Sequence, residues 1–427
     1  MDRPFEPGRD RAPSQPGEPR TQHGVLASGI MAPSARQLLH CHLADVLGAS
    51  RLVADGTAAL ADIAEDAHRD VRYRSSRDAA RLGGIPGLVY GSVRTAARLA
   101  GQALALASPD GQGAAHAIGS RRRDAAIAAL NGVVGDHLAA TGNSLASPMR
   151  LIHEGRELGV APLPRNPRVL VLVNGLCMGP RQWRRRGHDH GEALARELGL
   201  APVYLQYNTG LHVSENGRRF ADALEELRRR WPVPVEELAI VAHSMGGLVA
   251  RSACHAAAAR GHDWPRALRR LVFLGTPHHG APLERGGQRL ELLLAELPYV
   301  APFARLGRLR SAGITDLRHG SLLDEDWANE DRFAARGDRR RPVPLPAGVE
   351  CHALAAAVSE RRGGARDAVL GDGLVPVASA LGEHPDADLD LGLPAAYRWV
   401  GRGMHHFQLL DRPEVYAQLR ARLAGTR

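Results

Sequence analysis

The segment that most restricts the fold is a buried-strand pattern that runs straight into a helical pattern, with one serine between them. Residues 237–243 read ELAIVAH, Ser244 follows, and residues 248–260 have helical periodicity. A turn this sharp forces its central residue into strained backbone angles and requires small residues two positions before and after it. Ala242 and Gly246 meet that requirement. The pattern predicts that the Ser244 hydroxyl lies at a sheet edge, where the N–H groups that begin the helix favour negative charge.

Strand and helix patterns alternate on both sides of this turn. Continuous apolar runs such as RVLVLVN are typical of parallel strands that are covered on both faces. The alternation predicts an α/β fold with a mostly parallel, doubly wound sheet and right-handed crossovers. The predicted strands are 168–174, 202–207, 237–243, 268–274, 351–358 and 397–401, and the predicted helices are 190–198, 215–231 and 248–260.

The chain divides into three parts. Residues 1–35 are rich in Pro, Gly, Arg and Glu without periodicity, which predicts a disordered tail. Residues 36–160 show about three amphipathic helical stretches and form a helical extension, and residues 161–427 form the α/β domain. Two interpretations of the helical extension stay open: its apolar faces pack on the α/β domain, or they contact a partner or a lipid surface.

A serine hydroxyl becomes a good nucleophile only when a base takes its proton and an acid orients that base. In this architecture the acid and then the histidine follow the serine along the chain. Asp372 lies between two glycines in GDGLVP, after the strand pattern at 351–358. His406 lies in GMHHFQLL after the last strand, and the apolar residues that follow favour it over its neighbour His405. The predicted triad is Ser244, Asp372 and His406.

Acyl transfer also needs two backbone N–H donors for the oxyanion. One is predicted to be Met245, the residue after the nucleophile, and the other Leu176. Gly175 permits the tight turn after the strand at 168–174 that aims the Leu176 N–H inward.

These motifs, with LGTPHHGAPL at 274–283, resemble the α/β-hydrolase superfamily over about residues 165–425. More narrowly, they are similar to bacterial triacylglycerol lipases and esterases that resemble the glycosylphosphatidylinositol inositol-deacylase group. The resemblance implies the same triad and oxyanion donors, and a lid formed by an insertion after the sixth strand. One departure is Asn174, where the family usually has histidine before the turn glycine.

The insertion at 281–348 fits the lid that the resemblance implies. Its apolar residues recur at helical steps, which predicts a stripe over the pocket mouth, although a polar loop is an equal alternative. His278 and His279, in the LGTPHHGAPL motif where this insertion begins, are predicted to lie at a strand end, where they would line the substrate pocket. The predicted pocket residues are His278, His279, Leu290 and Leu294.

The composition narrows the choice of partners and location. The formal net charge is +9, but all 55 basic residues are arginine and they are scattered, so a nucleic-acid partner is not expected. The four cysteines are far apart and fit neither a disulfide framework nor a zinc site. We therefore expect no metal and no cofactor, and, without a signal or membrane-spanning pattern, a cytoplasmic protein.

The predicted function is hydrolysis of carboxylic esters with apolar acyl groups, from an ester or lipid substrate, through an acyl-enzyme. An acyltransferase or thioesterase would use the same triad and is the alternative. A catalytically silent scaffold with a hydrolase fold is the alternative from another class, and the ordered Ser, Asp and His disfavour it.

Overall fold

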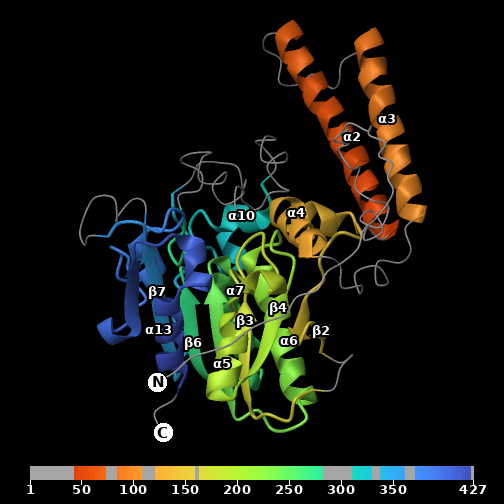
Figure 1. Ribbon diagram of the computed structural model, residues 1–427. Coiled ribbons are helices and arrows are strands. Elements are labelled where there is room, and N and C mark those ends of the chain that lie inside the picture. Colours follow the sequence, from red (N-terminus) through yellow and green to blue (C-terminus); the bar gives the residue numbers. More distant parts are fainter. Residues whose placement is uncertain are drawn as a thin grey trace, which may run out of the picture. The chain divides into compact units, whose positions relative to one another are not determined.

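The computed structural model describes residues 43–73, 84–107, 121–158, 163–281, 310–328, 337–360 and 371–424. Its centre is an eight-stranded sheet with the strand order β2-β1-β4-β3-β5-β6-β7-β8 (Figure 1). The strands are β1 (Arg150–His153), β2 (Arg156–Glu157), β3 (Arg168–Val173), β4 (Ala201–Gln206), β5 (Glu237–His243), β6 (Leu268–Leu274), β7 (Glu350–Ala357) and β8 (Arg398–Arg402).

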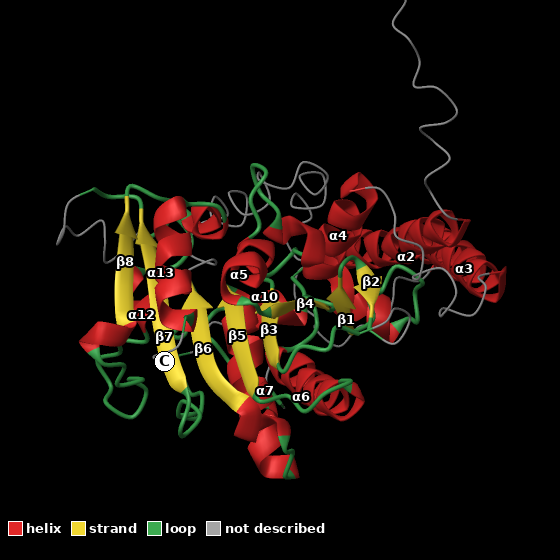
Figure 2. Cartoon of the chain, turned by 60° about the horizontal axis from the view of Figure 1, so that its bottom comes forward, coloured by secondary structure: helices red, strands yellow, loops and turns green. Residues whose placement is uncertain are grey.

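From β4 to β8 every neighbouring pair of strands is parallel. Figure 2 shows helices α5 (His190–Leu198) and α13 (Pro413–Leu423) on one side of the sheet. Helices α6 (Val213–Arg230) and α7 (Met245–Arg260) lie on the other. Because both faces are covered, the central strands are apolar throughout, and residues 169–173 of β3 are completely buried. The predicted doubly wound α/β fold is confirmed.

The six predicted strands and three predicted helices are all present, with starts and ends within about three residues of the predicted ones. The remaining short elements are η2 (Pro180–Trp183), η3 (Trp264–Ala267), α10 (Ala312–Asp316), η4 (Asp324–Asp326), α12 (Val377–Leu381), η5 (Ala395–Tyr397) and η6 (His406–Leu410). Among the helices that the structure describes, none is long and apolar enough to cross a membrane.

The helical segment ends earlier than the predicted residue 160, because β1 and β2 lie inside that range. Glu154 and Gly155 both have positive φ and form the two-residue hairpin turn between β1 and β2. β1 then pairs antiparallel with β4, with Leu151 opposite Leu205. A four-residue strand is too short to show a period, and its partner lies far along the chain. The sequence pattern therefore missed this edge of the sheet.

The predicted amphipathic helices are α2 (Leu43–Tyr73), α3 (Gly84–Ala107) and α4 (Arg121–Ala140). α2 and α3 form an antiparallel pair (Figure 1), joined by the buried Arg94, which binds Asp62 and the buried Glu65. α4 packs on the sheet domain: Asn208 donates from Nδ2 to the carbonyl of Gly135 at 2.8 Å. α4, from the predicted helical extension, thus packs on the α/β domain. Residues 1–35 lie outside the described residues.

The described part of the 281–348 insertion is held firmly against the domain. Ser311 donates to the carbonyl of Gly132 in α4 at 2.6 Å. Asp316 accepts from His212 Nδ1 at 3.0 Å and from the backbone N–H of Val213 at 2.7 Å. The predicted apolar stripe, including Leu290 and Leu294, lies outside the described residues.

Candidate active site

Ser244 lies between the end of β5 and the start of α7, with φ 54° and ψ −129°. This backbone region favours glycine, so the serine is held in a strained conformation. A Cβ on Gly246 would come within 2.6 Å of the Val173 carbonyl oxygen, so the close approach of α7 to β3 needs a glycine there. The N–H of Ser244 donates to the carbonyl of Leu274 at 2.8 Å, which fixes the turn to the end of β6.

His406 and Asp372 form a buried pair. Nδ1 of His406 is 2.6 Å from Oδ2 of Asp372, and both side chains are almost completely inaccessible to solvent. The other carboxylate oxygen accepts the backbone N–H groups of Leu374 at 3.0 Å and Val375 at 2.8 Å. A carboxylate that accepts from Nδ1–H fixes the neutral imidazole in the tautomer with a lone pair on Nε2. That Nε2 atom is buried and has no hydrogen-bond partner among the described residues.

The His406 ring lies close to the Ser244 turn. Gly275 follows Leu274, which binds the Ser244 N–H, and a Cβ on Gly275 would lie 3.0 Å from Cε1 of His406. The ring of His243, the residue before the serine, has its centroid 4.7 Å from that of His406. Asp372 and the ring of His406 therefore lie beside the Ser244 turn, at the carboxyl ends of the central strands, where ligands of open parallel sheets bind.

The adjacent histidine has a different environment. His405 is half-buried, and its backbone N–H donates to Oε1 of Gln408 at 2.8 Å. The carboxylate of Asp372 binds the ring of His406 instead.

The turn after β3 lies against the serine. A Cβ on Gly175 would be 2.8 Å from Cβ of Ser244, so only glycine fits there. Nδ2 of Asn174 donates to the carbonyl of Met178 at 2.6 Å and to that of Gly175 at 3.2 Å. The asparagine thereby holds the turn from inside. The N–H groups of Leu176 and Met245, the two predicted oxyanion donors, have no acceptor among the described residues.

Residues 166–340 match the family described as PGAP1-like alpha/beta domain. Over these residues the chain is similar to the PGAP1-like α/β domain, and its sheet has the predicted α/β-hydrolase fold. The match includes Ser244 and the turn after β3, whereas Asp372 and His406 lie beyond it. No curated protein matches the chain.

Several solved structures are similar to the chain. The mature lipase BlEst2 of Bacillus licheniformis is 17% identical over 66% of this chain and 98% of its own, with a TM-score of 0.39. Lipase B of Aspergillus fumigatus is 11% identical over 60% and 53%, with a TM-score of 0.34. The type II thioesterase YbtT of the yersiniabactin pathway is 16% identical over 64% and 97%, with a TM-score of 0.36.

Within the matched residues, His278 and His279 are bound to arginines. The ring of His278 is fully buried against Phe273, and its Nδ1 lies 3.3 Å from the guanidinium of Arg251. His279 Nδ1 accepts from Arg340 at 2.8 Å, and burial lowers the pKa of His279 to about 4. Neither histidine contacts the triad among the described interactions, and the part of the domain that would cover the pocket is not described. Their place in a substrate pocket stays a prediction.

Two further residues support the site and were not predicted. Gly275, the first glycine of the LGTPHHGAPL motif, has φ +59° and lies directly against the His406 ring. His190 on α5 lies with Nε2 3.1 Å from the carbonyl of Leu409, so it holds the segment η6 that begins with His406. The motif glycine could have been suspected from the sequence, whereas the His190 contact joins distant parts of the chain. Among the described residues, no cluster of His, Cys, Asp and Glu could hold a metal ion.

Proposed function

We propose that the chain is a serine hydrolase that cleaves carboxylic esters with apolar acyl groups, as lipases and esterases do. The observation that supports this most is the imidazole of His406, bound through Nδ1 to the buried Asp372 while its Nε2 has no partner among the described residues. A general base needs this arrangement, because the carboxylate orients the ring and stabilises the imidazolium that forms.

In the proposed reaction, the Ser244 hydroxyl attacks the carbonyl carbon of the ester while Nε2 of His406 takes its proton. The N–H groups of Leu176 and Met245 donate to the oxyanion of the tetrahedral intermediate. The C–O bond to the alcohol then breaks, and the imidazolium returns the proton to the leaving alkoxide. A water molecule attacks the acyl-enzyme by the same route, which releases the carboxylic acid and restores the serine.

The test uses a fluorophosphonate probe, which reacts covalently with activated serines, and esters of graded acyl length. Ser244→Ala is expected to abolish labelling and to lower kcat by a factor on the order of 10⁴ to 10⁶. Ser252→Ala is the matched control, because this serine also lies on α7 but donates only to the carbonyl of Leu322. Labelling of Ser244→Ala at the wild-type level would refute the proposal.

A further inference from the structure

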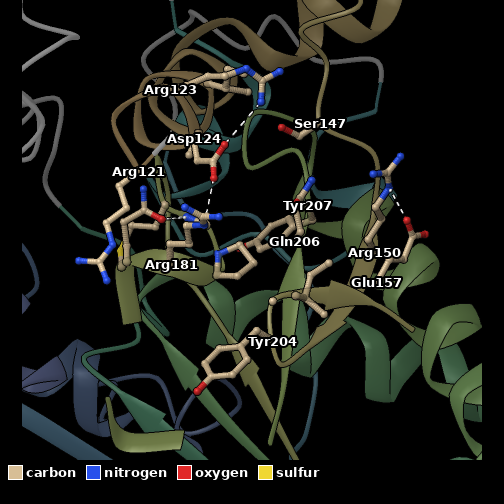
Figure 3. Close-up of a pocket in the computed structure, with 18 of the residues that line it drawn as sticks. Arg121, Arg123, Asp124, Ser147, Arg150, Glu157, Arg181, Tyr204, Gln206 and Tyr207 are labelled. Atoms are coloured by element: carbon tan, nitrogen blue, oxygen red, sulfur yellow. Dashed lines mark hydrogen bonds and ion pairs between the residues drawn. The ribbon is translucent and has the colours of Figure 1, made fainter. Parts of the chain in front are cut away.

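A cavity lies beside the turn after β3, and none of the three predicted triad residues lines it. Its volume is about 510 Å³, within the range of about 300–1,000 Å³ usual for small-molecule sites. It is bounded by the first turns of α4, the loop at 144–149, the β1–β2 hairpin, η2 and the end of β4 (Figure 3).

The interior of this cavity is largely apolar. Ile127 and Ala128 on α4 line it together with Ile152 on β1. Met178 and Tyr207 line it on the side of the turn after β3. Apolar surface of this kind stabilises a bound hydrocarbon chain by roughly 25 cal/mol per Å² removed from water.

The rim of the cavity carries six arginines, and four of them are paired with carboxylates. Figure 3 shows Asp124 between Arg123 and Arg181 on one wall, and Arg150 with Glu157 on the opposite wall. Arg123 is also bound by both carboxylate oxygens of Asp45, and Arg184 binds Glu192.

The remaining two arginines, Arg121 and Arg156, have no carboxylate partner among the described residues. They come from α4 and from β2, so positive charge without a counterion lies at two sides of an apolar cavity. This combination suits an amphiphilic anion, because a guanidinium binds a carboxylate through charge-assisted hydrogen bonds.

From this geometry we infer that the cavity binds the carboxylate of an acyl chain, with the chain on the apolar lining and the carboxylate at one of the two remaining rim guanidiniums, Arg121 or Arg156. The identity of the ligand as an acid released by ester hydrolysis rests on the proposed function, whereas its binding does not. The site would then hold a product of the reaction outside the catalytic centre.

Two residues of the cavity wall also hold the turn after β3 in place. The hydroxyl of Tyr207 donates to the carbonyl of Asn174 at 2.7 Å, and Asn174 in turn binds the carbonyl of Met178. Both Tyr207 and Met178 line the cavity, so an occupant contacts the residues that hold the turn carrying the Leu176 N–H.

The experiment measures binding to the full-length Ser244→Ala chain by titration calorimetry, with decanoate as the probe. Acetate supplies the charge without the chain, and decanol supplies the chain without the charge. Decanoate is expected to bind, and the other two ligands to bind at least about tenfold more weakly. Acetate lacks the apolar chain, and decanol forms only neutral hydrogen bonds, which contribute less than charged ones. No binding of decanoate, or equal binding of decanol, would overturn the inference.

Variants then locate the site. The double variant Arg121→Gln/Arg156→Gln should weaken decanoate binding about tenfold or more. Ala146→Trp, which fills the cavity from its loop, should abolish binding while the melting temperature stays near that of the parent. The exposed Arg269→Gln on β6 is the matched control for lost charge and should bind decanoate normally.

Unchanged affinity in both cavity variants would place the ligand elsewhere and overturn the inference. Fluorophosphonate labelling of the wild-type chain is measured separately. A failure of the proposed reaction is thereby distinguished from a failure of the cavity to bind.

Discussion

At the scale of single residues, Gly275 controls the position of His406 although it has no side chain. Its φ of +59° is costly for any other residue, and a Cβ there would lie 2.8 Å from Leu409 Cδ1 and 3.0 Å from His406 Cε1. The ring of His406 can lie between Asp372 and the Ser244 turn only because Gly275 has no Cβ atom.

Gly275→Ala should therefore lower kcat by about 10²-fold, because a shift of the base by about 1 Å has an effect of that size. Gly261→Ala is the matched control, since Gly261 also has positive φ (+66°) but nothing lies within 4 Å of its added Cβ. Both variants should lose stability in thermal unfolding, Gly275→Ala the more because of these close contacts, and only Gly275→Ala should lose turnover. An equal effect of both variants on kcat would show that backbone strain alone matters.

The choice between the two adjacent histidines is also a residue-scale prediction. His406→Ala should reduce ester hydrolysis about as much as Ser244→Ala, by a factor on the order of 10⁴ or more, because the triad acts as a unit. His405→Ala should retain most of the activity, since the Asp372 carboxylate binds His406. Steady-state kinetics on one soluble ester check both, and the reverse result would assign the base to His405.

The sequence predicted the turn at Ser244 because its requirements are local: Ala242 and Gly246 lie two positions either side. The order of Asp372 and His406 along the chain was enough to nominate them, because each follows a recognisable strand. The contact between Gly275 and His406 could not be predicted, since it depends on how β6 and η6 pack in three dimensions.

At the scale of elements, α5 and the segment η6 are joined by the buried His190. Burial lowers the pKa of His190 to about 3, and its ring lies against the carbonyl of Leu409. The unfolded chain takes up this proton near pH 6.5, whereas the folded chain does not. The contribution to stability is therefore complete above about pH 6.5 and is lost as the pH falls toward 3.

His190→Gln should reduce the acid sensitivity of folding. Between pH 7 and pH 5 the free energy of unfolding of the wild type should fall by up to about 2 kcal/mol more than that of the variant. Urea denaturation at the two pH values measures this difference. His255→Gln, on the exposed side of α7, is the control and should behave as the wild type does. Equal losses in the wild type and His190→Gln would contradict the assignment.

Long elements were easier to predict than short ones. The apolar runs of β3, β5 and β6 could be placed to within a residue, because parallel strands covered on both faces leave a continuous signal. β1 and β2 together cover six residues and depend on pairing with β4, so their local sequence carried almost no signal.

At the scale of the whole molecule, the described contacts divide the N-terminal helices between two roles. α4 is tightly packed on the sheet domain, where a Cβ on Gly132 would meet Sγ of Cys177 at 2.1 Å. α2 and α3 chiefly contact each other, and α2 is tied to α4 by the bidentate pair of Arg123 with Asp45.

Two shortened chains test this division. A chain that begins at residue 121 keeps α4, β1 and β2 and should hydrolyse soluble esters at near wild-type rates. A chain that begins at residue 163 loses all three and opens the edge of β4, and it should aggregate. Solubility and kcat on a short-chain ester are measured for both. A soluble, active chain from residue 163 would show that α4 and the hairpin are dispensable, whereas loss of activity from the first chain would assign α2 and α3 to the catalytic domain.

The strain at Ser244 sets function against stability within the same residue. Conformations of this kind cost on the order of 1–3 kcal/mol, a noticeable share of the total stability of a typical domain. Glycine would adopt φ 54° and ψ −129° without that cost. Natural selection for thermal robustness alone would therefore replace the serine. A hydroxyl at this strained position therefore lowers the stability of the fold in exchange for the chemistry proposed for Ser244.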